Sequence, residues 1–178
     1  MVEFTEESKE VLYSTEAVTV LHPSDVEFLK GAARLNERKR IRLCTHPSID
    51  DTLHEMIIVQ SRGCYVRPHR HLRKSESFHA IEGELDIVLF DHEGDVSRVI
   101  RLGQENGCAV YYRLGTPTYH TVVPQSEFVV FHETTNGPFR REQTEFAPWS
   151  PVENSLGEVE RYLSRLGKHI DEWTKEAR

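Results

Sequence analysis

Short apolar and alternating runs, separated by turn-forming residues, fill the middle of the chain. The runs are rich in Val, Ile, Phe and Tyr, which favour strands, and the segments between them carry Asp, Gly and other turn formers. We expect strands around Leu43 and over 54–60, 63–71, 77–81, 85–90, 96–101, 109–113, 120–123 and 127–132. Eight or nine short strands of this kind predict a mainly β protein built as a sandwich or barrel.

A segment before these strands has the pattern of a helix. Ser24 follows Pro23, and Glu27 stands three residues later, which is a capping-box pattern for a helix over 25–38. The basic run 38–42 is expected to be a solvated helix end rather than an anion patch, because the chain as a whole is acidic. Ahead of the helix, the apolar residues 17–21 are expected to form a short edge strand.

The last part of the chain combines a proline-containing crossing segment with a second helix. Pro148 and Pro151 cannot continue a strand, so we expect this segment to cross the barrel surface with Trp149 as a packing anchor. A helix is predicted over 153–173, where an apolar stripe recurs at steps of three and four: Leu156, Val159, Tyr162, Leu163, Leu166, Ile170 and Trp173. The stripe either packs on the outer face of the barrel or forms a homodimer contact.

The charge balance narrows the range of partners. The 29 acidic and 22 basic residues give a formal net charge of -7, which disfavours nucleic acid because its binders carry a basic field. The polar N-terminus has no apolar signal region, and no stretch approaches the roughly 18 apolar residues of a membrane span. We therefore expect a cytoplasmic protein whose partner is a small molecule, with no nucleic acid and no membrane.

The three cysteines do not indicate a cross-linked or thiolate-metal protein. Cys44, Cys64 and Cys108 are odd in number and show no C-x-x-C spacing. Cys64 lies near the candidate site in sequence, and a buried free thiol is its expected state.

The stretch 63–83 contains candidate metal ligands. His69 and His71 are two residues apart, so both imidazoles project from the same face of an extended strand. Residues 72–75 can turn the chain and return Glu76 alongside the two histidines. The sequence therefore predicts a metal site on one β-hairpin, with Gly63 and Gly83 at its bends.

These residues resemble the first motif of the cupin superfamily, G-x5-H-x-H-x(3,4)-E-x6-G, and fill each of its fixed positions. The resemblance implies a double-stranded β-helix, or jelly-roll barrel, with a short N-terminal helix and a C-terminal helix. It places one cupin domain over 1–178, with the barrel at about 41–135 and the C-terminal extension and helix at about 138–176. Cupin barrels often pair as dimers.

A fourth ligand is expected from the opposite wall of such a barrel, and His120 is the candidate. The stretch 114–120 resembles the second cupin motif, G-x5-P-x-G-x2-H-x3-N, in part. Gly115 and Pro117 occupy each other's expected places, and Pro124 stands where the family has Asn. The alternative is that His120 is only a polar strand residue.

Most of the chain also resembles a narrower group, the WbuC-type cupin fold metalloproteins. The residues that carry this likeness are 65–71, Lys74 with Glu76, Phe90-Asp91-x-x-Gly94, 137–139 and 146–153. Members of this group are single-domain metal-binding barrels found with surface-polysaccharide biosynthesis genes, and their reaction is not established. The resemblance therefore implies a fold and a site, but little chemistry.

Three imidazoles and one carboxylate suit one divalent ion, such as Zn, Fe, Ni, Mn or Cu. Four protein ligands on one face of an octahedral ion leave two positions for water or a chelating substrate. The sequence identifies no catalytic residue. It leaves open a metalloenzyme acting on a small sugar-derived or carboxylate-bearing molecule, and a non-catalytic protein that binds or senses such a ligand. A metal-free isomerase of the sugar-epimerase type is disfavoured, because it has no need of the His-x-His and Glu76 arrangement.

Three further residues are candidates for substrate binding. By alternation, Tyr65 and Arg67 share the strand face of His69, and Phe78 shares that of Glu76. Tyr65 and Phe78 could instead be core residues. A guanidinium pointing into a barrel needs an anion, so Arg67 pairs either with Glu76 or another wall carboxylate, or with a substrate carboxylate or phosphate.

Overall fold

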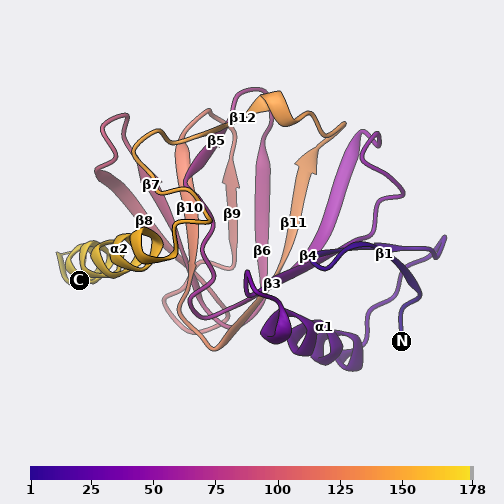
Figure 1. Cartoon of the computed structure of the whole chain (residues 1–178). Coiled ribbons are helices and arrows are strands. Elements are labelled where there is room, and N and C mark those ends of the chain that lie inside the picture. Colours follow the sequence, from indigo (N-terminus) through magenta and orange to yellow (C-terminus); the bar gives the residue numbers. More distant parts are fainter. Residues whose placement is uncertain (177–178) are drawn as a thin grey trace.

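Two β-sheets face each other and carry one helix each on their outer sides (Figure 1). The structure is a computed structural model and describes residues 1–176. The larger sheet has the order β1 (Phe4–Ser8), β2 (Val11–Ser14), β3 (Arg40–Cys44), β4 (Leu53–Ser61), β11 (Phe128–Asn136), β6 (Glu76–Glu82) and β9 (Tyr111–Leu114). The smaller sheet has the order β12 (Thr144–Phe146), β5 (His69–His71), β10 (Tyr119–Pro124), β7 (Leu85–Phe90) and β8 (Val96–Leu102).

The strand order is that of a jelly roll. Strands β4 to β11 divide into two antiparallel sets, β4-β11-β6-β9 and β5-β10-β7-β8. Apolar side chains on the facing sides form the barrel core: Phe78, Ala80, Leu85, Ile87, Leu102, Tyr112, Val122, Val129 and Phe131. The predicted mainly β jelly-roll fold is therefore confirmed. Strands β1, β2 and β12 extend the sheets beyond the predicted barrel range.

Helix α1 (Pro23–Leu35) covers the outer face of the larger sheet (Figure 1). Its residues Leu29 and Ala33 are buried with a set of strand residues that includes Ile41, Leu43 and Val130. The predicted capping pair is wrong. Asp25 rather than Glu27 closes the first turn, because its carboxylate accepts hydrogen bonds from the backbone N–H of His22 at 2.8 Å and of Val2 at 2.8 Å.

The predicted edge strand over 17–21 is also wrong. Residues 15–22 have no strand, and Val18 and Val20 are 78% and 54% exposed. The first strands lie earlier, in the hairpin of β1, whose side chains are largely polar, and β2, whose sequence is Val-Leu-Tyr-Ser. Strand β2 then pairs with β3 in parallel, so the chain must travel through α1 between them.

Residues 137–155, called here the strap, cross the smaller sheet before helix α2 (Leu156–Glu176) (Figure 1). The ring of Trp149 lies 4.9 Å from that of Phe90, and a Cβ on Gly94 would lie 2.8 Å from the same indole. Trp149 is thus the packing anchor that the prolines predict. Gly94 has a φ of 97°, which also favours glycine.

Helix α2 packs its apolar stripe on the outer face of the smaller sheet. Val88, Phe90, Tyr119 and Ala147 are buried with Tyr162, Leu166 and Ile170. Of the two predicted roles of the stripe, packing on the barrel is confirmed.

This packing predicts different effects for two leucines of the same helix. Leu166 is 4% exposed and Leu156 is 69% exposed. Leu166→Ala should lower the free energy of unfolding by about 2–4 kcal/mol, because it removes buried methyl groups and leaves a cavity. Leu156→Ala should change it by less than about 0.5 kcal/mol. Urea unfolding of both variants measures the difference, and equal effects would contradict the docking of α2.

Candidate metal centre

Three imidazoles converge between the two sheets. His69 and His71 lie on β5, and His120 lies on the neighbouring strand β10, directly opposite His69 in the register. One ring nitrogen from each histidine lies within 4.8 Å of those of the other two. A set of three nitrogens at this spacing can surround one ion. The pairing of β5 with β10 produces the arrangement. The predicted single β-hairpin is wrong, because residues 72–75 carry the chain from β5 in the smaller sheet to β6 in the larger sheet.

Glu76 faces the three imidazoles from the first position of β6 in the opposite sheet. Its side chain is 3% exposed. Its Oε1 lies 2.8 Å from Nε2 of His120, and its Oε2 lies 3.3 Å from Nε2 of His71. The four predicted metal ligands are therefore brought together, and their binding of an ion remains a prediction.

Each imidazole is oriented by a contact at its other nitrogen. Nδ1 of His69 donates to the carbonyl of Arg67 at 2.9 Å, and Nδ1 of His120 donates to the carbonyl of Thr118 at 2.9 Å. Nδ1 of His71 hydrogen-bonds with the hydroxyl of Thr144 on β12 at 3.1 Å. Partners of this kind fix the tautomer and ring orientation of metal-binding histidines, so Nε2 is the atom left to bind an ion.

The contact between His120 and Glu76 requires a cation. With Nδ1 of His120 donating, the neutral ring presents a lone pair at Nε2, and Oε1 of Glu76 is also an acceptor. Both atoms are buried and lack a hydrogen-bond partner. Two buried acceptors 2.8 Å apart are unfavourable unless a proton or a metal ion lies between them. The residues present therefore fit a divalent ion.

The titration of these groups follows from burial and mutual charge. Burial alone would raise the pKa of Glu76, but His120 and His71 outweigh it and hold the pKa well below its usual range. Burial alone would lower the pKa of His120, but the Glu76 carboxylate outweighs it and raises the pKa. Burial, with a further effect of His120, lowers the pKa of His69 to about 3, so His69 stays neutral. In the absence of metal, the pair His120–Glu76 thus holds one proton.

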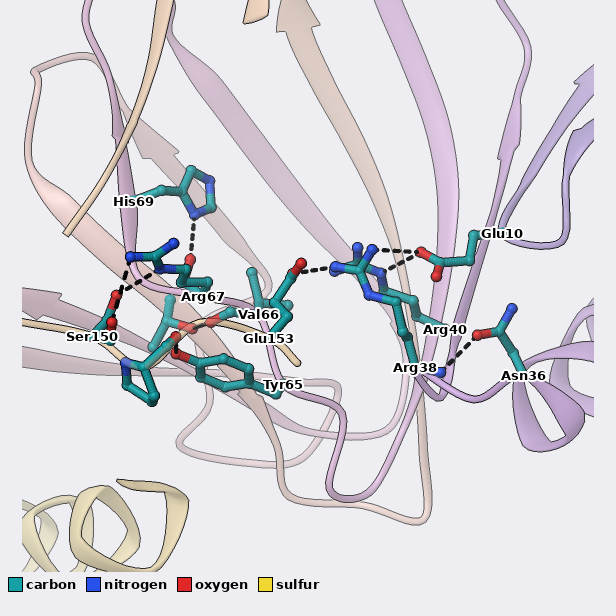
Figure 2. A network of polar contacts seen from close by, with 12 residues as sticks. Glu10, Asn36, Arg38, Arg40, Tyr65, Val66, Arg67, His69, Ser150 and Glu153 are labelled. Atoms are coloured by element: carbon teal, nitrogen blue, oxygen red, sulfur yellow. Dashed lines mark hydrogen bonds and ion pairs between the residues drawn. The ribbon is translucent and has the colours of Figure 1, made fainter. Parts of the chain in front are cut away.

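Arg67 does not have the carboxylate partner that was one of its predicted alternatives. Its Nε donates to the hydroxyl of Ser150 at 3.1 Å (Figure 2). Its guanidinium lies 4.9 Å from the centre of the Phe146 ring. Within residues 1–176, no carboxylate lies within ion-pair distance of Arg67. The predicted pairing of Arg67 with Glu76 or another wall carboxylate is wrong, because the strap supplies neutral acceptors instead. Its binding of a substrate anion stays a prediction.

Tyr65 also faces the strap rather than the metal centre. The hydroxyl of Tyr65 (Figure 2) donates to the carbonyl of Pro151 at 2.9 Å. The ring of Tyr65 lies 5.9 Å from that of Tyr162 on α2. The predicted strand face is wrong for Tyr65, because residues 64–68 are not part of a strand and do not alternate. Phe78 does share the face of Glu76, and its ring packs 4.9 Å from that of Phe131 in the barrel core.

The basic run 38–42 forms ion pairs and is not a freely solvated helix end. Arg38 pairs with Glu153 of the strap and with Glu10, and Arg40 donates to Glu10 at 2.8 Å (Figure 2). The helix ends at Leu35, and Arg40 already begins β3. These contacts join the N-terminal hairpin to the strap, next to the residues that hold Arg67.

Sequence reasoning did not identify two polar residues on the inner face beside Glu76. Glu133 on β11 pairs in register with Phe78, and burial together with the Glu76 charge raises the pKa of Glu133 to about 8. Tyr112 on β9 pairs with Phe78 from the other side, and its buried hydroxyl has no hydrogen-bond partner. Strand alternation could have predicted the position of Glu133. Val129, Phe131 and Glu133 are two apart, so the Glu133 carboxylate lies on the same inward face as two apolar side chains.

The chain was compared with protein families and curated proteins. A family described as a domain of unknown function (DUF6016) matches residues 21–102, which is somewhat less than half of the chain. No curated protein matches.

Solved structures share parts of the architecture. A protein from Shewanella oneidensis is 14% identical with a TM-score of 0.47, over 57% of this chain and 65% of that one. The Cnp3 cupin domain of Schizosaccharomyces pombe is 9% identical with a TM-score of 0.43, over 55% of this chain and 64% of that one. Oxalate decarboxylase from Bacillus subtilis is 17% identical with a TM-score of 0.44, over 55% of this chain and 24% of that one. This chain spans less than two thirds of each, and the jelly-roll assignment rests on its own strand order.

Within the described chain, neither helix combines the length and apolar character that a membrane crossing requires.

The proton held by His120 and Glu76 predicts how metal binding depends on pH. A metal ion must displace that proton. The affinity for the metal is therefore highest above the raised pKa of His120 and falls as the pH drops below it. Zinc affinity, measured by competition with a chromophoric chelator, should fall at least about tenfold per pH unit in that range. A constant affinity between about pH 7.5 and 5.5, around the ordinary histidine value, would contradict the assignment of His120.

The contacts of Arg67 predict that it positions His69. Arg67→Met removes the hydrogen bond to Ser150 and loosens the segment whose carbonyl holds Nδ1 of His69. We expect a loss of about 1–2 kcal/mol in the free energy of unfolding and about a tenfold loss of zinc affinity. Arg73→Met, which changes an exposed arginine of the neighbouring turn, is the control and should alter neither. Unchanged stability and zinc affinity in Arg67→Met would contradict this role.

Proposed function

We propose that the chain is a metal-binding cupin in which His69, His71, His120 and Glu76 hold one divalent ion. We further propose that it is an enzyme acting on a small sugar-derived or carboxylate-bearing molecule. The observation that carries the proposal is the convergence of a ring nitrogen from each of three histidines, with Nε2 of His71 and of His120 beside the buried carboxylate of Glu76 and each Nδ1 engaged elsewhere. The proton shared by His120 and Glu76 leaves unexplained why two further imidazoles, those of His69 and His71, gather at the same point.

A bound ion would act as a Lewis acid toward ligand oxygens. The chain contributes the orientation of the imidazoles through Arg67, Thr118 and Thr144, and it limits water through the burial of Glu76 and His120. Glu133 is the group on the inner face that can accept or release a proton near the ion, because its carboxyl group makes no hydrogen bond within residues 1–176.

The resemblance to WbuC-type proteins supports a finer proposal. The matching positions include Lys74, two residues before Glu76, and the strap residues 146–153, of which Ser150 holds Arg67. On this basis the substrate derives from surface-polysaccharide biosynthesis, the protein acts in the cytoplasm, and the functional unit is a homodimer.

The zinc content of the purified protein tests whether these four residues bind a metal ion. Wild-type protein purified without added metal and then loaded with zinc should hold about one ion per chain. His71→Ala should lose most of it, because three ligands remain and the Thr144 contact is lost, while the circular-dichroism spectrum stays β-rich. His92→Ala, which changes an exposed histidine of the loop between β7 and β8, is the control. Full zinc retention in a folded His71→Ala variant would end the ligand assignment.

Turnover distinguishes the enzyme from its alternative. Candidate sugar acids and sugar nucleotides are incubated with the zinc-, iron-, nickel- and manganese-loaded protein, and the products are followed by mass spectrometry. Metal-dependent conversion that is lost in His71→Ala supports the enzyme. Metal-dependent binding without conversion in every case assigns the non-catalytic binding protein instead.

A further inference from the structure

Helix α2 and the strap meet on the outer side of the smaller sheet (Figure 1), and a groove of about 790 Å³ lies between them. The strap contributes Trp149, Ser150 and Pro151 to the lining of this groove, and α2 contributes side chains from the range 158–165. The volume lies within the roughly 300–1,000 Å³ that is typical of small-molecule sites. The imidazoles of the candidate metal centre lie between the sheets, so the groove is a separate site.

Two hydrogen-bond donors among the lining residues have no acceptor. Nε1 of Trp149 and the hydroxyl of Tyr162 are buried, and neither has a hydrogen-bond partner within the described residues. Tyr162 is 8% exposed, and its ring stacks on that of Trp149 with the ring centres 6.5 Å apart. A buried indole N–H or phenol O–H usually has a partner. The two groups therefore call for an acceptor that the described part of the chain does not supply.

Two arginines of α2 line the same groove. Arg161 and Arg165 are four residues apart, so they share one face of the helix. Both are exposed, and no carboxylate of residues 1–175 lies at ion-pair distance from either guanidinium. A Cβ added to Gly157 would lie 3.7 Å from Nη1 of Arg161, so this guanidinium lies over the preceding turn of the helix.

Two glutamates, Glu158 and Glu160, also line the groove and balance the arginines in formal charge. Both are exposed, so water and salt screen their charges. The lining is therefore formally neutral in a chain whose net charge is -7. Because its buried groups without a partner are donors, and its arginines have no ion-pair partner, an oxyanion satisfies both sets of groups together.

We propose that this groove binds a small organic phosphate, in which the phosphate group is attached to a partly apolar body. A phosphate ester presents three strong acceptor oxygens, whereas a carboxylate presents two, and four donor-bearing side chains line the groove: Trp149, Arg161, Tyr162 and Arg165. The planar guanidinium fork matches phosphate oxygens. The apolar body packs against Trp149 and Pro151.

Phenyl phosphate is the probe, because benzoate and phenol share its ring and differ in the polar group. Calorimetric titration of the zinc-loaded wild-type chain should show phenyl phosphate binding at least about tenfold more tightly than benzoate or phenol. Arg161→Gln and Arg165→Gln should each weaken the binding of phenyl phosphate about tenfold, because each removes a charge-assisted hydrogen bond.

The emission of Trp149 reports where the ligand binds. Trp149 and Trp173 are the two tryptophans of the chain, so Trp173→Phe leaves Trp149 as the single indole. The emission of this variant should change with phenyl phosphate concentration and saturate with the same dissociation constant as the calorimetric titration.

Three further variants serve as controls. Lys175→Gln changes an exposed lysine ten residues beyond Arg165 on the same helix, about 15 Å along its axis, and should bind as the wild type. Glu158→Gln should bind phenyl phosphate about two- to fivefold more tightly, because it removes an opposing charge from the lining. His71→Ala should bind it unchanged, because the groove does not use the metal ion.

Equal binding of the three ligands, or no saturable binding of phenyl phosphate, overturns the proposal. Binding that persists in the Arg161→Gln, Arg165→Gln double variant also overturns it, and so does binding that is lost in His71→Ala, because the phosphate then occupies the metal centre. Absence of zinc from the wild-type chain contradicts the proposed function and not the groove. Thermal melts of the variants confirm that they are folded.

Discussion

The buried carboxylate of Glu76 requires a positive charge beside it, and the surrounding side chains are arranged to hold one. A charged group that is removed from water is unfavourable unless a positive charge is close. Here the neighbours are imidazoles, and Nδ1 of His69 and of His120 donates to a backbone carbonyl, so Nε2 of each neutral ring carries a lone pair. A single proton on His120 meets this requirement in part. A divalent ion meets it more fully, because it can satisfy the carboxylate and these lone pairs together.

The barrel and the strap together position the four candidate metal ligands. Facing sheets supply Glu76 from β6 and the imidazoles from β5 and β10. The strap adds β12 to the edge of β5, where Thr144 pairs with His71 and Phe146 pairs with His69 in the register. Further along, Ser150 holds Arg67, and Arg67 provides the carbonyl for His69. Residues that follow the barrel in sequence thereby orient two of the four candidate ligands.

The local part of the site could be predicted from the sequence. His69, His71 and Glu76 lie close together in the sequence, so strand alternation and a short turn predict that they meet, although the turn joins the two sheets rather than two strands of one hairpin. His120 could be placed only through a partial family motif, because its position depends on the pairing of β10 with β5. Alternation predicts the face of Phe78, which lies within β6, but not that of Tyr65, since alternation ends where the strand ends.

Long-range contacts account for what the sequence does not reveal. Arg67 and its strap partner Ser150 are more than 80 residues apart in the sequence, and no local pattern predicts this contact. Glu133 and Tyr112 become neighbours of the site only through the registers of β11 and β9 with β6. Strands β1 and β2 are short, and β1 has a single apolar residue, so their pattern resembles a loop until β3 is placed beside β2.

The most direct test of the metal centre is anomalous diffraction at the zinc edge from crystals of the zinc-loaded protein. The account predicts one peak at about 2.0–2.2 Å from Nε2 of His69, His71 and His120 and from a carboxylate oxygen of Glu76. A peak bound through Nδ1, or a peak away from these four side chains, would contradict it.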